Sequence, residues 1–296
     1  MTSITAGMVK ELRERTGLGM MDCKKALSDA DGNMEKAIED LRKASGLKAA
    51  KKASRVAAEG VVMTKVAEDG NYGVIIEVNS ETDFVARDDN FLSFAEQALV
   101  SSFEASQASV EELLEKGLEE SRQALVQKIG ENVNLRRLKR LNFKNANQGI
   151  VESYVHNNSK IGVLISLKGG DEALAKDVAM HIAAMKPKAL DISGIDQSLL
   201  DKEQRVAREK AVKSGKPAEI IEKMVSGAVN KYVKEISLLG QVFVKADDGK
   251  QTVAEYLKSK GATVKAFELF VVGEGLEKKS ENFAEEVAAT QAASKA

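Results

Sequence analysis

The sequence repeats itself at an interval of 89 residues. When the chain is shifted onto itself by that interval, glycines and valines of a first copy match those of a second copy without a gap. The identical pairs are Gly60/Gly149, Val62/Val151, Val66/Val155, Gly73/Gly162, Val74/Val163, Ile76/Ile165 and Ala86/Ala175. A repeat constrains architecture before any single helix or strand is assigned. The chain is therefore predicted to contain two copies of one folding unit.

Each copy begins with a pattern typical of a β-hairpin. In the first copy, residues 60–66 and 73–78 favour strands, and residues 69–71 between them favour a turn. Two helices and a closing strand are expected next, at residues 91–99, 110–129 and 130–138. The second copy is expected to contain a hairpin, a helix and a closing strand at residues 149–167, 172–185 and 261–269. Its closing strand is displaced by an insertion.

Residues 5–43 are predicted to form three short amphipathic helices. Thr5 and Asn33 are suitable N-caps, and Gly17 can end a helix in the left-handed conformation. Cys23 occupies an apolar position of the second helix, so we expect it to be buried rather than reactive. Helices this short can bury only one another, which predicts a small three-helix domain.

A basic segment follows this domain. Residues 42–55 contain six Lys or Arg side chains and no acidic one. Two interpretations stay open: the segment is a solvated linker helix, or it docks on an acidic surface of a partner.

The insertion in the second copy is predicted to be a helical hairpin. Its two arms flank a turn at residues 214–217, and they are long enough to project from the core as a coiled coil. A short C-terminal helix is expected around Phe283 and Val287. The predicted fold class is α+β with antiparallel sheets. The predicted segments are the three-helix domain with its basic linker at 1–55, core unit 1 at 56–145, core unit 2 at 146–194 and 237–275, the helical hairpin at 195–236 and a C-terminal module at 276–296.

The composition excludes several classes of function. Lys and Arg number 44 against 45 Asp and Glu, so no overall field attracts nucleic acid or an anionic membrane. One cysteine and two histidines cannot supply a disulfide framework or a zinc cluster. The N-terminus lacks the pattern of a secretory signal, and no apolar run approaches the ~18 residues of a membrane span. We therefore expect a cytoplasmic protein without direct nucleic acid or membrane partners.

No motif indicates an enzyme. The phosphate-binding pattern G-x-x-x-x-G-K-[ST] is absent, and Gly17 and Gly19 lack the third glycine and the preceding strand of a dinucleotide site. His156 in a hairpin turn and His181 in a helix belong to different elements, and no serine or cysteine stands in a nucleophile context. We expect no catalytic residue, no metal and no cofactor.

The segment 79–86 is the most informative part of the chain for function. It follows a strand and sets Asp83 beside Phe84, whereas the second copy carries Ala173 at the position of the ring. One interpretation is structural, with Phe84 packed beside Phe91 and Phe94 under the next helix. The other is that the ring anchors a partner protein, because a few buried aromatic side chains often supply most of the energy of an interface. Loss of the ring in the copy favours the second interpretation.

These motifs resemble those of the bacterial translation elongation factor Ts family, whose members are guanine-nucleotide exchange factors for elongation factor Tu. The resemblance extends over nearly the whole chain and includes residues 9–17, 19–27, 77–86, 161–164 and 179–181. Its most specific part is the string Thr82, Asp83, Phe84, Val85 and Ala86. The resemblance implies that this string, residues 82–86, forms a wedge that binds the partner. Some relatives have cysteine at the position of Ser80 and glutamine at that of Glu81, and we expect neither residue to touch the wedge.

The resemblance implies a fold and an activity. The family has a ubiquitin-associated-like helical domain, a duplicated α+β core, a coiled-coil insert and a C-terminal module. In such factors the aspartate and phenylalanine of the motif enter the G domain of the partner near its magnesium site. Asp83 and Phe84 take these roles here.

The resemblance also implies further contacts. Lys10, Arg13, Met20 and Met21 of the three-helix domain are expected to support the wedge on the partner. His181 is expected either to contact the partner or to lie at the surface or boundary of its helix. A homodimer or a 2:2 complex with elongation factor Tu stays open. So does a different class of function, in which the chain passively holds a partner through its three-helix domain.

Overall fold

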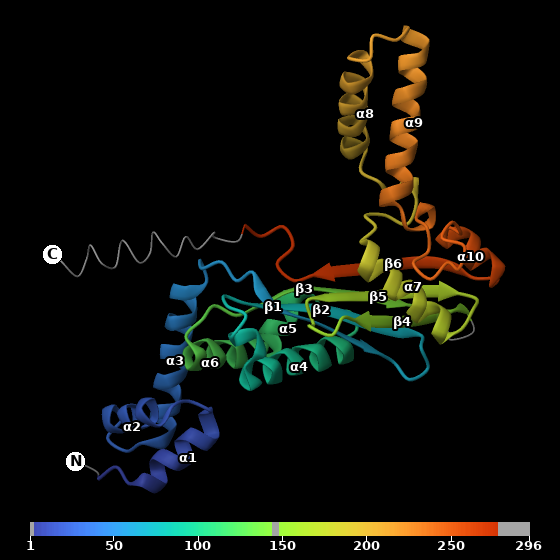
Figure 1. Ribbon diagram of the computed structural model, residues 1–296. Coiled ribbons are helices and arrows are strands. Elements are labelled where there is room, and N and C mark those ends of the chain that lie inside the picture. The colour runs from blue at the N-terminus through green and yellow to red at the C-terminus, as the bar shows by residue number, and fades with distance from the viewer. Residues whose placement is uncertain (1–2, 144–147, 278–296) are drawn as a thin grey trace, which may run out of the picture.

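The core of the protein consists of two small sheets packed between two layers of helices (Figure 1). The computed structural model describes residues 3–143 and 148–277. A three-helix domain extends from one end of the core, and a pair of long helices projects from the other part of the body. The α+β class with antiparallel sheets is confirmed.

The three-helix domain contains α1 (Ala6–Thr16), α2 (Met20–Asp29) and α3 (Met34–Lys52). Thr5 caps α1 by accepting a hydrogen bond from the Met8 N–H, and Asn33 caps α3 in the same way. Gly17 ends α1 at φ 69°, a left-handed conformation that costs glycine little. Cys23 is buried in the small core that the helices share, as expected.

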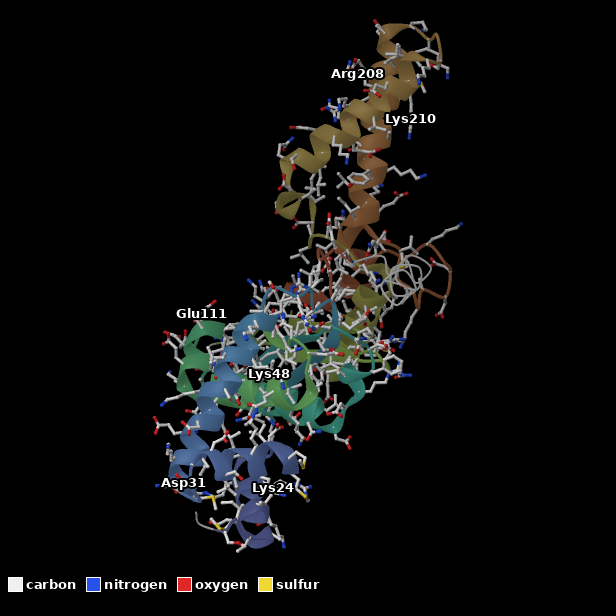
Figure 2. All side chains as sticks on the ribbon, turned by 90° about the vertical axis from the view of Figure 1, so that its left-hand side faces the viewer. Lys24, Asp31, Lys48, Glu111, Arg208 and Lys210 are labelled. Atoms are coloured by element: carbon white, nitrogen blue, oxygen red, sulfur yellow. The ribbon has the colours of Figure 1, made fainter. Side chains whose placement is uncertain are left out.

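The basic segment is a continuation of α3. The second half of α3 packs along α6 (Glu119–Ile129) of the first core unit, where Ser45 hydrogen-bonds to Gln127 and Lys52 to the carbonyl of Gly130. Lys48, labelled in Figure 2, donates to the Gln127 carbonyl at 3.0 Å. The linker interpretation therefore needs correction, because α3 is partly buried and several of its basic groups bind the chain's own core.

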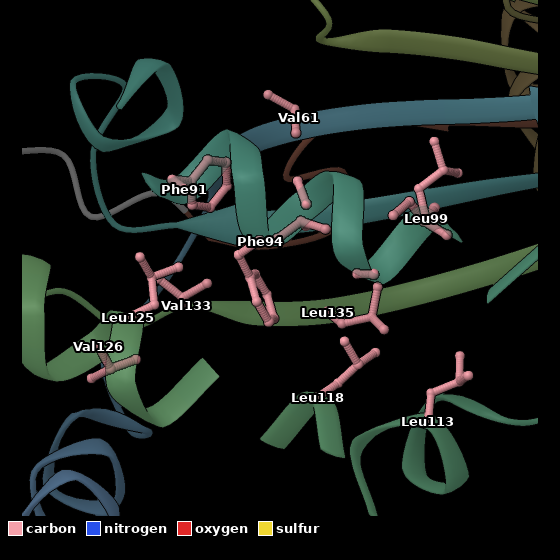
Figure 3. Close-up of a cluster of buried hydrophobic side chains, with 14 of the residues drawn as sticks. Val61, Phe91, Phe94, Leu99, Leu113, Leu118, Leu125, Val126, Val133 and Leu135 are labelled. Carbon is pink, nitrogen blue, oxygen red and sulfur yellow. The ribbon is translucent and has the colours of Figure 1, made fainter. Parts of the chain in front are cut away.

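Core unit 1 has the strand order β1-β2-β3, with β1 (Glu59–Val66), β2 (Tyr72–Ser80) and β3 (Asn134–Asn142). Helices α4 (Asp89–Glu104), α5 (Val110–Leu113) and α6 (Glu119–Ile129) cover one face. Figure 3 shows Phe91 and Phe94 of α4 among the buried side chains beneath. The single helix expected at 110–129 is wrong, because Gly117 adopts φ 118° and interrupts it.

Core unit 2 repeats this topology. Its strands are β4 (Ile150–Val155), β5 (Ile161–Lys168) and β6 (Thr263–Val271), and α7 (Glu172–Met185) and α10 (Val253–Ser259) cover its outer face. Both units have a register shift at the same place, between Glu77 and Val78 and between Ser166 and Leu167. The displaced closing strand is thus confirmed as β6.

The two sheets face each other around an approximate two-fold axis. The N–H of Val62 donates to Ser159 across the interface, and at the equivalent position the N–H of Val151 donates to Gly70. Side chains from both sheets, including Val62, Ile75, Val151, Leu164 and Phe270, form a buried layer between them. The duplicated sequence therefore folds into a pseudo-symmetric pair rather than into two independent bodies.

The insertion forms the predicted helical hairpin, α8 (Gln197–Val212) and α9 (Ala218–Ile236). Small side chains such as Ala207 and Ala211 pack against Val225, and Arg208, labelled in Figure 2, pairs with Glu222 of the other arm. No helix among the described residues is both long and apolar enough to cross a bilayer. The helix expected around Phe283 and Val287, in the C-terminal module 276–296, lies outside the described residues except for 276 and 277.

Candidate functional site

Phe84 points into solvent from the loop that follows β2. Its side chain is 83% exposed, the highest value among the exposed large hydrophobic side chains of the described residues. Phe91 and Phe94, with which it was alternatively expected to pack, lie in the core of unit 1 without it. The packing interpretation of Phe84 is therefore wrong, and the ring is available to another molecule.

Asp83 lies beside the ring and is also accessible. Its carboxylate pairs with Arg87 at 2.9 Å, and the side chain of Arg87 is largely in solvent while that of Asp83 is about half exposed. An exposed pair of this kind contributes little to stability. The carboxylate can therefore exchange Arg87 for a group on a partner at small cost.

The backbone beneath Asp83 and Phe84 is held by two reciprocal carboxylates. Glu131 accepts hydrogen bonds from the N–H of Thr82 at 3.0 Å and from its hydroxyl at 2.7 Å. In the opposite direction, Glu81 accepts from the N–H of Asn132 at 2.6 Å. Hydrogen bonds to charged acceptors are stronger than neutral ones. We call Glu81, Thr82, Glu131 and Asn132 the loop clamp.

Ser80 also supports the loop, since its hydroxyl donates to the carbonyl of Thr82 at 2.9 Å. The expectation that Ser80 and Glu81 have no part in the wedge therefore needs correction. Both hold Thr82 and its neighbours in place, although neither side chain forms the exposed surface.

Val85 and Ala86 turn inward. Both are buried in the core of unit 1, where they begin the 3-10 turn Val85–Arg87 that leads into α4. Asp88 then caps α4 by accepting from the N–H groups of Asn90 and Phe91. The predicted segment 82–86 thus divides into an anchored start at Thr82, an exposed pair at Asp83 and Phe84, and a buried end.

Unit 2 lacks this loop altogether. Its helix α7 begins at Glu172, the position equivalent to Asp83, and Ala173 stands where unit 1 has Phe84. In unit 1 the helix begins only at Asp89. The exposed ring and the turn behind it are therefore an addition to the shared unit, and the fold does not require them.

The predicted contact residues of the three-helix domain are all at its surface. Met20 and Met21 at the start of α2 are 59% and 74% exposed. Lys10 and Arg13 lie exposed on α1, where Lys10 is near Glu14 at 3.8 Å. Two adjacent exposed thioether side chains form an adaptable apolar surface. The structure leaves these four residues free to meet a partner.

Comparison with known proteins identifies the family. The model of the family "Elongation factor TS" matches residues 81–274. Curated relatives named elongation factor Ts are similar over almost their full lengths: that of Hahella chejuensis is 55% identical over 98% of this chain and 99% of its own, and that of Teredinibacter turnerae 53% over 99% of each. The relative from Dechloromonas aromatica is 52% identical over 100% of this chain and 99% of its own.

The chain belongs to the elongation factor Ts family. Membership in the Ts family makes it a translation elongation factor of the nucleotide-exchange kind. The matched region begins at Glu81, so it contains the whole exposed pair and both halves of the loop clamp.

Like Val85 and Ala86, the predicted contact residue His181 of this Ts family member lies in the interior. It is fully buried in α7, where its Nε2 lies 3.0 Å from the side-chain oxygen of Gln241 and its Nδ1 accepts from the N–H of Val244 at 3.2 Å. Placement at a helix surface or boundary is therefore wrong. A direct contact of His181 with a partner stays a prediction, and it would require the segment around Gln241 and Val244 to move.

Sequence reasoning missed the loop clamp. Glu131 is 49 residues away from Thr82, and in the sequence Glu131 and Asn132 look like ordinary polar residues before a strand. Only the pairing of β2 with β3 brings the two segments together. The available signal was Gly130, which ends α6 at φ 85° and turns Glu131 toward Thr82.

Proposed function

We propose that this chain binds elongation factor Tu and accelerates the release of GDP from it, with Asp83 and Phe84 as the wedge that disturbs the magnesium and phosphate site. The observation that carries the proposal is the exposed ring of Phe84 on a loop that the loop clamp holds in unit 1 and that unit 2 lacks. A largely exposed ring is costly to keep in water, and it gains free energy when a partner covers it.

The mechanism follows from how a GTPase holds GDP. Loop amides, a lysine and Mg²⁺ contact the phosphates together, so release is slow as long as all of these contacts persist. A ring and a carboxylate inserted beside the metal remove part of them. The effect is reciprocal: the factor by which the wedge weakens GDP binding is also the factor by which GDP weakens binding of the wedge. The nucleotide-free partner is therefore the state that binds best.

The loop clamp suits a wedge because it fixes the direction in which Asp83 and Phe84 point. Binding energy is lost when a flexible segment must be ordered, at about 1–2 kcal/mol per backbone residue. Thr82 is already fixed by Glu131, and Asn132 also donates to the carbonyl of Arg55 at 2.8 Å just beyond α3. Because the backbone N–H of Asn132 binds Glu81 and its side-chain amide binds Arg55, the loop and the end of the three-helix domain are joined through one residue, which supports simultaneous contact of both with one partner.

The test is release of fluorescent GDP from purified elongation factor Tu with and without this protein. Phe84→Ala and Asp83→Ala should each slow the accelerated release while the thermal unfolding midpoint changes little, because both side chains are outside the core. Leu92→Ala, which removes a partly exposed apolar side chain from the nearby helix α4, is the matched control and should retain acceleration. Wild-type acceleration by the Asp83/Phe84 double variant would refute the wedge.

A passive holding function is the second candidate, and the exposure of Met20 and Met21 favours it. The variant Met20→Ser/Met21→Ser distinguishes the two. If the wedge is responsible, this variant weakens binding but saturating amounts still accelerate release. If the three-helix domain merely holds the partner, binding is lost and the Phe84→Ala change has no effect on it.

A further inference from the structure

Glu77 is a fully buried carboxylate that has a complete set of hydrogen-bond donors. Its two oxygens accept from Arg136 at 3.0 Å, from Arg137 at 2.6 Å, from the side-chain amide of Asn79 at 3.0 Å and from the N–H of Gly273 at 2.8 Å. Removing one partner of such a cluster leaves a buried charge unpaired, which destabilises a fold by an amount comparable to truncating a core side chain. The fold therefore depends on keeping the charge of Glu77 paired.

A β-bulge allows two consecutive arginines to reach this one carboxylate. Glu77 pairs with Arg137 in the register of β2 and β3, whereas the next residue Val78 pairs with Leu135. Arg136 is the extra residue of the bulge, and side chains that would alternate between the two faces now approach the same group.

Unit 2 has the same bulge without the charges. Ser166 stands at the position of Glu77, and its hydroxyl donates to the carbonyl of Ala266 at 3.3 Å. The extra residue of this bulge is Lys265, which is exposed. Because unit 2 builds the same strand pair with a serine, the fold of a unit does not require the charged cluster.

The cluster instead connects unit 1 to the end of unit 2. Arg137 donates to the carbonyl of Val271 at 3.2 Å, and Arg136 donates to that of Glu274 at 2.6 Å. Arg137 also lies over the ring of Phe270, 4.1 Å from its centroid. The Gly273 N–H that binds Glu77 completes these contacts. The segment 270–274 is therefore gripped from unit 1 by side chains of β2 and β3.

The segment fits closely against the backbone of unit 1 at Gly273. Gly273 has φ 72°, and a Cβ atom added there would collide with the carbonyl oxygen of Ala58, just before β1. The chain leaving β6 thus passes between the Glu77 cluster and the point where the chain enters unit 1.

The same cluster lies at the base of the wedge. Glu77 is seven residues before Phe84 on the strand that leads into the loop, and Arg136 follows the Glu131 half of the loop clamp at the start of β3. Asn79 extends the cluster toward the loop, since its amide donates both to Glu77 and to the carbonyl of Glu59. The strand ends that position Phe84 are therefore the ones that the cluster fastens to unit 2.

We propose that Glu77 is a positioning residue for nucleotide exchange, which fastens the wedge-bearing strands of unit 1 to unit 2 so that the two act as one rigid body on the partner. This inference rests on the proposed function of Asp83 and Phe84. The wedge can displace part of the partner only if the strands that carry it do not move in response. The rigidity of the connection between units 1 and 2 therefore limits how far the wedge displaces the partner.

The test compares full-length wild type and Glu77→Gln in GDP release at increasing concentrations of the factor. The glutamine side chain keeps the shape of the carboxylate but presents an N–H₂ group to the arginines. We expect the concentration for half-maximal effect to change less than about twofold, because the exposed contact surface is unchanged, and the maximal rate at saturation to fall about tenfold, as misplaced groups lose catalysis. Hydrogen exchange of the segments containing Gly273 and Thr82 should rise together.

Two variants serve as controls. Ser166→Ala alters the equivalent bulge of unit 2 and should leave the maximal rate unchanged. Leu257→Ala, in the core of unit 2, should lower stability at least as much as Glu77→Gln without lowering the maximal rate, which separates positioning from mere destabilisation. An unchanged maximal rate for Glu77→Gln, or an equal loss for Leu257→Ala, would overturn the inference. Failure of wild type itself to accelerate release would instead refute the proposed function.

Discussion

The hydroxyl of Thr64 donates a hydrogen bond to the hydroxyl of Ser153 at 3.0 Å, and these two residues occupy equivalent positions of the repeat. Equivalent residues can touch each other only where they lie close to the axis that relates the two units. The axis therefore passes between β1 and β4. Contacts away from it should occur in reciprocal pairs, as the hydrogen bonds of Val62 with Ser159 and of Val151 with Gly70 do.

Gly73 and Gly162 form such a reciprocal pair, and we expect alanine at either position to destabilise the core. A Cβ atom at Gly73 would lie 2.8 Å from side-chain carbons of both Leu164 and Val151, and one at Gly162 would collide with Val62. Overpacking of this kind costs about 1–3 kcal/mol. Urea unfolding should show losses of similar size for Gly73→Ala and Gly162→Ala.

The matched control for this pair is Gly227→Ala. Gly227 lies exposed within α9, and no atom is near the position of an added Cβ. Alanine in a helix interior is favoured over glycine by about 0.5–1 kcal/mol, so this variant should be slightly stabilised. Equal effects of all three substitutions would contradict the reciprocal packing.

Much of the fold could be predicted because the sequence pattern of the core unit occurs twice. The strands, the closing strand after the insertion and the helical hairpin all follow from periodicity and from the repeat. The break at Gly117 could not be predicted in this way, since a single glycine within a helical pattern is often tolerated. Nor could the packing of α3 on α6, because a run of basic residues does not reveal that Lys48 and Lys52 bind backbone carbonyls of the same chain.

The loop clamp gives a second prediction. Glu131→Ala removes both acceptors of Thr82, and ordering the freed backbone on binding then costs about 1–2 kcal/mol per residue. We expect GDP release at limiting concentrations of the factor to slow about tenfold, since about 1.36 kcal/mol corresponds to tenfold in rate. The measurement is the initial rate at several concentrations well below saturation.

Glu115→Ala is a suitable comparison for Glu131→Ala, because Glu115 is exposed on the turn before α6. Its rate should match wild type. If both variants behave alike, the clamp does not position Phe84.

The candidate site could be predicted only in part. Loss of the ring in unit 2 indicated that Phe84 is not a packing residue, and its exposure confirms this. The support of the loop depends on hydrogen bonds between Thr82 and Glu131, which are far apart in the sequence, and no local sequence pattern indicates them. His181 was misplaced because a histidine among apolar residues of a helix is compatible with either face, and only Gln241 and Val244 show that the ring is buried.

The third prediction concerns pH and Glu77. Burial would raise the pKa of this carboxyl, but the hydrogen bonds from Gly273, Asn79 and Arg136 and the charge of Arg137 hold the pKa below its ordinary value of 4.5. A lowered carboxyl pKa contributes stability above the pKa of the unfolded chain, and the contribution is lost as pH falls through the folded pKa. The difference in unfolding free energy between wild type and Glu77→Gln should therefore shrink as pH falls from 7 to about 3. A difference that is constant over this range would show that the charge of Glu77 is not what stabilises the cluster.

The fourth prediction concerns the buried histidine. Val244 donates to Nδ1 of His181, so Nδ1 carries no proton, and Nε2 donates to Gln241 in a neutral ring. Burial lowers the pKa of His181 from its ordinary value of 6.5, although the hydrogen bond to Gln241 acts in the opposite direction. Below pH 6.5 the unfolded chain gains a proton that the folded chain does not, so stability should fall as pH decreases, by at most about 1.4 kcal/mol per pH unit for one group.

Unfolding by urea at pH 7.5, 6.5 and 5.5 tests this for wild type and His181→Gln, which cannot titrate. The stability advantage of wild type should decrease over this range, mainly between pH 6.5 and 5.5. His156→Gln, which replaces the other histidine of the chain at an exposed position, controls for loss of an imidazole as such. If the pH profiles of wild type and His181→Gln are parallel, the ring does not titrate differently in the folded and unfolded chains. The same variants bear on partner contact. If His181→Gln at pH 7.5 exchanges nucleotide like wild type, the ring serves only to hold the segment around Gln241 and Val244.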